Sequence, residues 1–129
     1  MSQPLPVEFV ASMRKMLGDD AERLFVALDT EPATSIRLNP MKPAHVFDGE
    51  KIGWSEWGRY LDIRPQFTLD PLFHAGCYYV QEACSMFVGE VLNQYLKPDS
   101  IVLDLCAAPG GKSTLISQFL GNEGLLVSN

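Results

Sequence analysis

The segment from residue 98 to residue 129 constrains the fold of this chain more than any other. Residues 100–105 form a largely apolar run, which is typical of a strand buried on both faces of a parallel sheet. A Gly-rich turn follows over residues 106–111, then a helical pattern over residues 112–120 and a second apolar run over residues 125–127. Strand, Gly-rich turn, helix and strand make the opening unit of a doubly wound α/β domain.

One such unit leaves its strand edges and one sheet face exposed, because a doubly wound sheet needs several further parallel strands. We therefore expect this sequence of 129 residues to be a truncated piece of a longer protein. In this reading an α+β N-terminal region over residues 1–97 is followed by the first βαβ unit of a Rossmann-like α/β domain over residues 98–129.

Hydrophobic spacing and turn signals predict the elements of the N-terminal region. Gly18 is expected to end the first helix, and Asp19 or Asp20 to cap the second. The expected elements are helices over residues 7–17 and from about residue 20, short strands over 34–38 and 45–47, an irregular aromatic-rich segment over 50–76, a strand over 77–80 and a helix over 82–96.

The net charge of the chain and the lengths of its apolar stretches limit the kinds of partner that it can bind. The chain has 16 acidic and 10 basic residues, a net charge of −6, so its surface as a whole does not attract nucleic acid or anionic lipid. A local basic patch stays open. No uncharged apolar stretch approaches the roughly 20 residues that span a bilayer, and residues 1–6 show no secretory signal. The sequence therefore predicts a cytoplasmic protein without a membrane partner.

Three cysteines, Cys77, Cys84 and Cys106, stand without a CxxC pair, and the chain has only two histidines, His45 and His74. Neither a disulfide framework nor a zinc site is expected from this pattern, so no metal-binding residue is predicted. Cys77 and Cys84 lie in apolar or helical surroundings and are predicted to be buried packing residues.

The Gly-rich turn has the features of a ligand-binding loop. Its small residues let a ligand approach the backbone closely, and the start of the following helix attracts an anionic group. Asp104, at the carboxyl end of the first strand, is expected to hold the loop by accepting its N–H bonds. Open α/β sheets place nucleotides in the crevice at this point.

An alternative hypothesis is that the same turn binds the phosphates of a nucleotide. Gly111-Lys112-Ser113 matches the end of the pattern G-x-x-x-x-G-K-[ST]. The first glycine of that pattern would stand at position 106, which is Cys106. Residues 106–113 would then be a degenerate P-loop that binds ATP or GTP.

Residues 102–113, Val-Leu-Asp-Leu-Cys-Ala-Ala-Pro-Gly-Gly-Lys-Ser, resemble the S-adenosylmethionine loop of the Nop/Sun family of RNA cytosine-5 methyltransferases. Two upstream blocks resemble the same family, especially its bacterial ribosomal-RNA members. The first consists of residues 67–76, 78–83 (Tyr-Tyr-Val-Gln-Glu-Ala) and 85–86. The second is residues 34–40, Thr-Ser-Ile-Arg-Leu-Asn-Pro. Together the blocks cover most of residues 34–129.

This resemblance implies S-adenosylmethionine as the cofactor. The residues that it assigns to cofactor binding are Cys106, Ala107, Ala108, Pro109, Gly110, Gly111 and Lys112. Lys112 would add a positive charge near the methionine carboxylate, or be a solvated lysine of the first helical turn.

The resemblance also says where the chemistry lies. The family adds a cysteine thiolate to carbon 6 of cytosine, which makes carbon 5 reactive, and a second cysteine assists release. Both cysteines, and the acid that binds the ribose, belong to later motifs beyond residue 129. No catalytic residue is therefore predicted in this chain, which is expected to be inactive by itself.

The implied partner is RNA, ribosomal RNA first, and not DNA. Aromatic and cationic residues interleave between residues 54 and 64, which suits base stacking and phosphate contact, or else a core patch that anchors a loop. They are Trp54, Trp57, Arg59, Tyr60 and Arg64. A non-catalytic RNA-binding or assembly piece is the third reading of the chain.

Two further pairs of polar residues belong to the upstream block. Asp70 and His74 suit either a general acid–base pair or, as we favour, a local structural hydrogen bond. Gln81 and Glu82 are expected to cap or line the cofactor domain rather than to take part in the chemistry.

Overall fold

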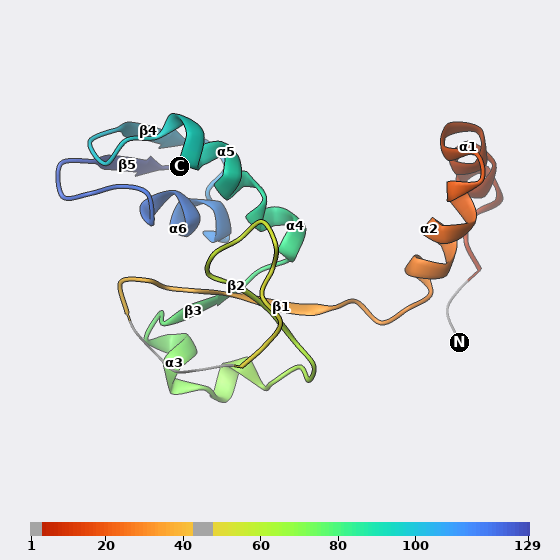
Figure 1. Ribbon diagram of the computed structural model, residues 1–129, viewed down its shortest axis with the longest axis horizontal. Coiled ribbons are helices and arrows are strands. Elements are labelled where there is room, and N and C mark those ends of the chain that lie inside the picture. Colours follow the sequence, from red (N-terminus) through yellow and green to blue (C-terminus); the bar gives the residue numbers. More distant parts are fainter. Residues whose placement is uncertain (1–3, 43–47) are drawn as a thin grey trace. The chain divides into compact units, whose positions relative to one another are not determined.

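The structure is a computed structural model that describes residues 4–42 and 48–129 (Figure 1). The chain folds into two compact units, Met1–Pro32 and Ala33–Asn129. The short strand predicted over residues 45–47 lies outside the described residues. The domain boundary expected between residues 97 and 98 stays a prediction. No helix in the described ranges has the length and apolar composition needed to cross a membrane.

The first unit is a pair of helices, α1 (Val7–Leu17) and α2 (Asp20–Leu28), as predicted. Gly18 ends α1 with a φ of 58°. The predicted acidic cap of α2 is wrong, because Asp19 already has helical backbone angles and its side chain makes no capping hydrogen bond. Instead, the Ala21 N–H donates to the Gly18 carbonyl at 3.2 Å, which closes the turn between the helices.

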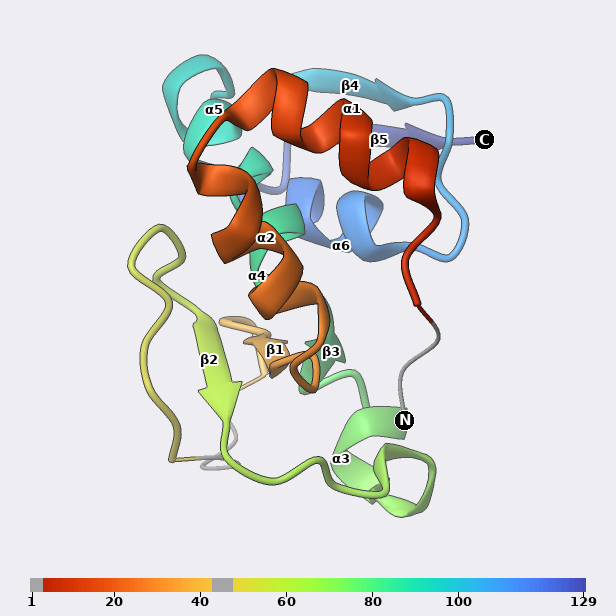
Figure 2. The same ribbon diagram turned by 90° about the vertical axis from the view of Figure 1, so that its right-hand side faces the viewer.

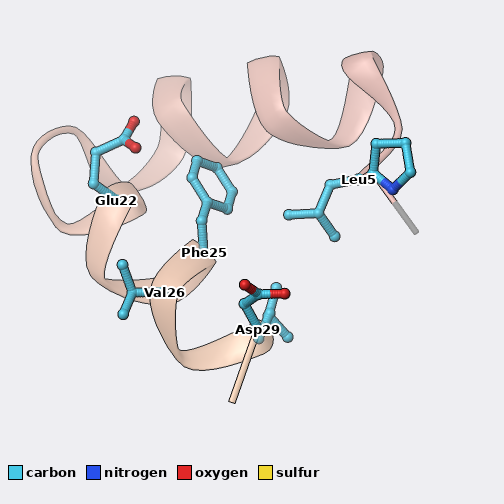
Figure 3. Close-up of a pocket in the computed structure, with 7 residues that line it drawn as sticks. Leu5, Glu22, Phe25, Val26 and Asp29 are labelled. Carbon is cyan, nitrogen blue, oxygen red and sulfur yellow. The ribbon is translucent and has the colours of Figure 1, made fainter. Parts of the chain in front are cut away.

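Packing between these two helices is modest. Ala21 is fully buried, and the rings of Phe9 and Phe25 meet edge to face with centroids 6.4 Å apart. A cavity of about 360 Å³ lies within the unit, and its lining includes the apolar Leu5 and Phe25 and the acidic Glu22 and Asp29 (Figure 3).

A three-stranded antiparallel sheet organises the second unit, with β1 (Thr34–Leu38) between β2 (Gly58–Leu61) and β3 (Tyr78–Val80). The sequence predicts the strands at β1 and β3, whereas β2 falls inside the segment predicted to be irregular. Only four residues long, β2 shows no visible alternation in the sequence. Its pairing with β1, from Thr34–Leu61 to Arg37–Gly58, makes it a strand.

The core beneath this sheet is built from Ile36, Phe67, Cys77 and Tyr78, each at most 9% exposed. Phe67 belongs to a 3₁₀ turn, η1 (Phe67–Leu69), which precedes the short helix α3 (Pro71–His74). Cys77 is therefore buried, as predicted.

Asp70 ties α3 to the sheet. One of its carboxylate oxygens accepts the Leu72 N–H at 2.9 Å, and the other accepts the Tyr78 hydroxyl at 2.7 Å. His74 Nε2 lies 2.8 Å from the Thr68 carbonyl. The two side chains thus make local structural hydrogen bonds, as favoured from the sequence, but not to each other.

The remaining elements form a second layer of structure in this unit (Figures 1 and 2). The helix predicted over residues 82–96 is two segments, α4 (Ala83–Met86) and α5 (Val88–Tyr95), which meet at Phe87. After them come β4 (Ile101–Asp104), α6 (Gly111–Ser117) and β5 (Leu125–Ser128). β4 and β5 pair in parallel, so the order strand, helix, parallel strand is the one expected.

Burial of β4 on both faces is the part of this prediction that is wrong. Ile101 and Leu103 are 78% and 58% exposed, whereas Asp104 is 9% exposed. Side chains alternate along a strand, so Asp104 faces α6 and the alternate residues face the other way. Within the described residues no element covers that second face, which leaves its apolar side chains exposed.

Candidate functional site

Asp104 holds the Gly-rich loop, as its position at the end of β4 predicts. Its Oδ1 accepts the N–H of Cys106 at 3.1 Å, and its Oδ2 accepts the hydroxyl of Ser113 at 2.6 Å. Asp104 and Ser113 are each only 9% exposed. A buried carboxylate therefore joins both ends of the loop, which fixes the path of the residues between them.

These bonds speak against the P-loop reading. In a P-loop the Ser or Thr hydroxyl binds Mg²⁺ beside the nucleotide phosphates. Here the Ser113 hydroxyl is buried and donates to Asp104, and the position of the first P-loop glycine is Cys106.

Gly110 sets the turn into α6. Its φ of +107° lies in the region that side chains rarely adopt, and its N–H donates to the Ala107 carbonyl at 2.6 Å. The preceding Ala108–Pro109 peptide bond is cis. Gly110 is the N-cap residue of α6 and, as a glycine, makes no side-chain capping hydrogen bond.

A cavity of about 200 Å³ is lined both by residues of this loop and by residues from β3 to α4. Six of the seven predicted cofactor-binding residues line it, and the seventh, Gly110, shapes the turn behind them. Tyr79, Gln81, Glu82 and Ser85 also line it. The structure thus brings the predicted loop residues together around one cavity, which Glu82 also lines.

Arg37 is the functional residue to which the sequence assigns no role. It lies in the middle strand, is 2% exposed, and donates to the Gln81 side-chain oxygen, to the Gly111 carbonyl at 3.0 Å and to the Thr114 hydroxyl at 2.6 Å. Burial lowers the pKa of Arg37 to about 10. The guanidinium therefore stays charged at neutral pH and joins the antiparallel sheet to the start of α6.

Two residues of the β3 segment complete this clamp, which we define as Arg37, Tyr79 and Gln81. The Gln81 amide donates to the Gly111 carbonyl at 3.2 Å, and the Tyr79 hydroxyl donates to the Pro109 carbonyl at 3.1 Å. The Arg37 guanidinium also lies 5.8 Å from the centre of the Tyr79 ring. The signal in the sequence is a cation inside a short strand that carries apolar residues on either side of it, because such a charge needs buried partners.

Aromatic and cationic side chains of the segment over residues 54–64 make contacts within the chain. The Trp54 indole N–H donates to the Ala83 carbonyl at 2.7 Å, and the Arg59 guanidinium donates to the Gly58 carbonyl at 2.7 Å. Arg64 lies over the Phe67 ring at 5.5 Å. Trp54 and Trp57 each stay 38% exposed. Contact of this segment with RNA stays a prediction.

The cysteines divide differently from the prediction. Cys84 is exposed rather than buried, and its thiol lies 3.4 Å from Glu82 Oε2. Met86 takes the inner face of α4 instead, at 1% exposure. Cys106 is exposed in the loop.

Comparison with known proteins places this arrangement in the Nop/Sun class of RNA cytosine-5 methyltransferases. Residues 5–83 match the family described as the N-terminal domain of 16S rRNA methyltransferase RsmF, and the chain belongs to that family.

The chain is also similar to individual methyltransferases. The chain is 32% identical to ribosomal RNA small subunit methyltransferase F of Pectobacterium atrosepticum, over 97% of this chain and 29% of that protein. It is also 32% identical to the tRNA (cytosine(49)-C(5))-methyltransferase of Pyrococcus abyssi, over 86% of this chain and 39% of that protein. A crystal structure of a methyltransferase homologue from Pyrococcus horikoshii matches with a TM-score of 0.79 and 28% identity, over 96% of this chain and 44% of that one.

The chain therefore spans about a third of the length of the curated relatives that it matches.

Proposed function

We propose that the protein carrying this chain transfers a methyl group from S-adenosylmethionine to carbon 5 of cytosine in ribosomal RNA. The observation that carries the proposal is the loop of residues 106–112, which lines a cavity at the end of β4 in a chain of the RsmF family. A ribosomal RNA substrate would place the protein in the cytoplasm, with RNA rather than DNA as its partner.

The residues around the cavity fit this cofactor. S-adenosylmethionine supplies an electrophilic methyl group, and its methionine part carries both an ammonium and a carboxylate. Lys112 and Glu82 both line the cavity, which offers a charge of each sign. Small loop residues let a ligand lie against the backbone, and Gly111 leaves the cavity wall without a side chain.

The task of this chain in the reaction is then to bind and orient the cofactor. Asp104 holds the start of the loop through the N–H of Cys106. The clamp of Arg37, Tyr79 and Gln81 holds its end through hydrogen bonds to backbone carbonyls. In this proposal residues 98–129 begin a Rossmann-like cofactor domain, and residues 1–97 form the region that faces the RNA. The nucleophilic cysteine belongs to a later part of the protein.

Calorimetric titration of the full-length protein with S-adenosylmethionine, ATP and ribosomal RNA tests the proposal. We expect binding of S-adenosylmethionine and RNA, and cofactor-dependent methylation of cytosine in the RNA. The 129-residue chain alone should transfer no methyl group. Binding of ATP with no binding of S-adenosylmethionine would instead support the degenerate P-loop, and RNA binding without methyl transfer would support a non-catalytic RNA-binding piece.

A further inference from the structure

A second cavity, of about 190 Å³, lies beside the clamp and differs in charge from the other pockets described here. Its lining residues include Arg37, Asn39, Gly76, Tyr78, Tyr79 and Gln118. None of them is acidic, whereas glutamates or aspartates line the pocket of the first unit, the cofactor cavity and the cavity beside Trp54 and Trp57. In a chain with a net charge of −6, this pocket is a local exception.

Its charge comes from Arg37, a buried cation that forms no ion pair among the described residues. The guanidinium has five N–H donors, and its hydrogen bonds go to two uncharged side chains and one backbone carbonyl. The Arg37 Nε is buried and has no hydrogen-bond partner in the described structure. A buried charge without a counter-ion is costly, so this arrangement favours an anion in the adjacent cavity.

Lys42 adds a second cation at the rim. Its ammonium donates to the Ala75 carbonyl at 2.6 Å, and a Cβ placed on Gly76, which lines the cavity, would lie 3.4 Å from it. An ammonium has three N–H donors, so further donors stay available. The carboxylate of Asp70 stands behind Tyr78, whose hydroxyl it binds, and does not line the cavity.

We propose that this cavity, between Lys42 at its rim and Arg37 at its wall, binds a phosphate group of the RNA backbone. Its volume of about 190 Å³ has room for a phosphate group. Arg, Lys, Asn and Gln are among the side chains that hold nucleic-acid phosphates, and the cavity has all four at its wall or rim.

The place of the cavity agrees with this ligand. Tyr79 lines both this cavity and the cofactor cavity, so a phosphate bound here would hold the RNA strand next to the methyl donor. Phosphate contacts set the position of a strand without reading its sequence. The inference rests on the proposed RNA substrate and adds the place at which one of its phosphates is held.

The test compares Lys42→Gln with Lys97→Gln, an exposed lysine just after α5, in the full-length protein. Fluorescence anisotropy measures the affinity for a labelled ribosomal-RNA oligonucleotide across a series of KCl concentrations. The logarithm of the RNA association constant falls as the logarithm of the salt concentration rises. Loss of one phosphate contact makes this negative slope shallower by about 0.7 to 1. We expect that loss for Lys42→Gln, an unchanged slope for Lys97→Gln, and unchanged S-adenosylmethionine affinity for both.

Equal slopes for the two lysine variants would overturn the proposal. So would a loss of S-adenosylmethionine affinity without a loss of RNA affinity in Lys42→Gln, because the anion held would then be the cofactor's carboxylate. Methyl transfer to RNA by the wild-type protein is scored separately. If it fails while Lys42→Gln still lowers the slope, the proposed function is wrong and the phosphate site stands.

Discussion

Arg37 donates a hydrogen bond to the backbone carbonyl of Gly111 at 3.0 Å, although 74 residues separate the two in the sequence. The bond joins the central strand of the antiparallel sheet to the first residue of α6. The sheet that we place on the RNA side therefore helps to set the shape of the loop that we place on the cofactor side.

Arg37→Lys should weaken both the fold and the cofactor site. Lysine has no planar fork and cannot reproduce hydrogen bonds to three separate partners, so buried acceptors lose their donors. We expect a loss of about 1–3 kcal/mol in the free energy of unfolding, measured by urea denaturation, and a weaker S-adenosylmethionine affinity by calorimetry. Arg64→Lys is the matched control, since Arg64 is exposed over Phe67. Wild-type cofactor affinity in folded Arg37→Lys would show that the clamp does not shape the loop.

The two loop glycines should respond to substitution for different reasons. Gly110→Ala places a side chain at a φ of +107°, which costs about 1–2 kcal/mol. At Gly111, a Cβ would lie 3.3 Å from the Gln81 amide nitrogen and 3.4 Å from the Tyr79 ring, so Gly111→Val forces the clamp to shift. Both changes should weaken S-adenosylmethionine binding, measured by calorimetry.

Gly53→Ala is the control for this pair, because a Cβ there meets no atom within 4 Å. It should leave cofactor affinity unchanged. Wild-type affinity in both loop variants would remove the cofactor assignment of residues 106–112.

The order of the elements can be predicted from the sequence because it depends on local patterns. The helix over Val7–Leu17 and the strand over Thr34–Leu38 have the predicted bounds, since apolar spacing and a following glycine or Asn-Pro mark them. The strand Gly58–Leu61 cannot be predicted in this way, because its identity depends on pairing with the distant strand Thr34–Leu38.

The candidate site likewise has a part that can be predicted from the sequence and a part that cannot. Asp104 can be assigned to the loop because it lies next to it in the sequence. The partners of Arg37 cannot be named, since they lie 44 to 77 residues away and meet it only after the sheet and α6 have packed together. Exposure of Ile101 is missed because an apolar run predicts burial without saying which element provides it.

Tyr78 makes the stability of the fold sensitive to alkaline pH. Burial, and then the hydrogen bond to Asp70, raise its pKa well above the ordinary value of 10.0. Below about pH 10 the hydroxyl is protonated in both the folded and the unfolded chain. At higher pH the unfolded chain loses this proton and the folded chain keeps it, so the contribution of Tyr78 to stability is lost as the pH rises.

Tyr78→Phe should therefore flatten the fall of stability above about pH 10, measured as the midpoint of urea unfolding against pH. Tyr95→Phe serves as the control, because Tyr95 is 77% exposed. The same alkaline slope in wild type and Tyr78→Phe would contradict this account.

Cys106→Ser should leave a protein that still forms a covalent adduct with RNA containing 5-fluorocytosine. Cys106 is exposed in the loop, where its N–H is held by Asp104 and it lines the cavity assigned to the cofactor. A nucleophile must instead stand over the flipped cytosine, on the far side of the methyl group that is transferred. Trapping requires a thiolate to add to carbon 6 and a methyl group to be transferred to carbon 5. Carbon 5 then carries fluorine in place of the proton whose loss would release the enzyme, so the adduct persists.

Serine is nearly isosteric with cysteine, so the turn should survive the change with at most a somewhat weaker cofactor affinity. We expect the adduct, seen as a slower band on a denaturing gel, for Cys106→Ser and for the control Cys84→Ser at saturating S-adenosylmethionine. The nucleophile then lies outside residues 106–112. If folded Cys106→Ser binds the cofactor normally and forms no adduct, while Cys84→Ser does, Cys106 takes part in the chemistry, and the division between cofactor loop and nucleophile is wrong.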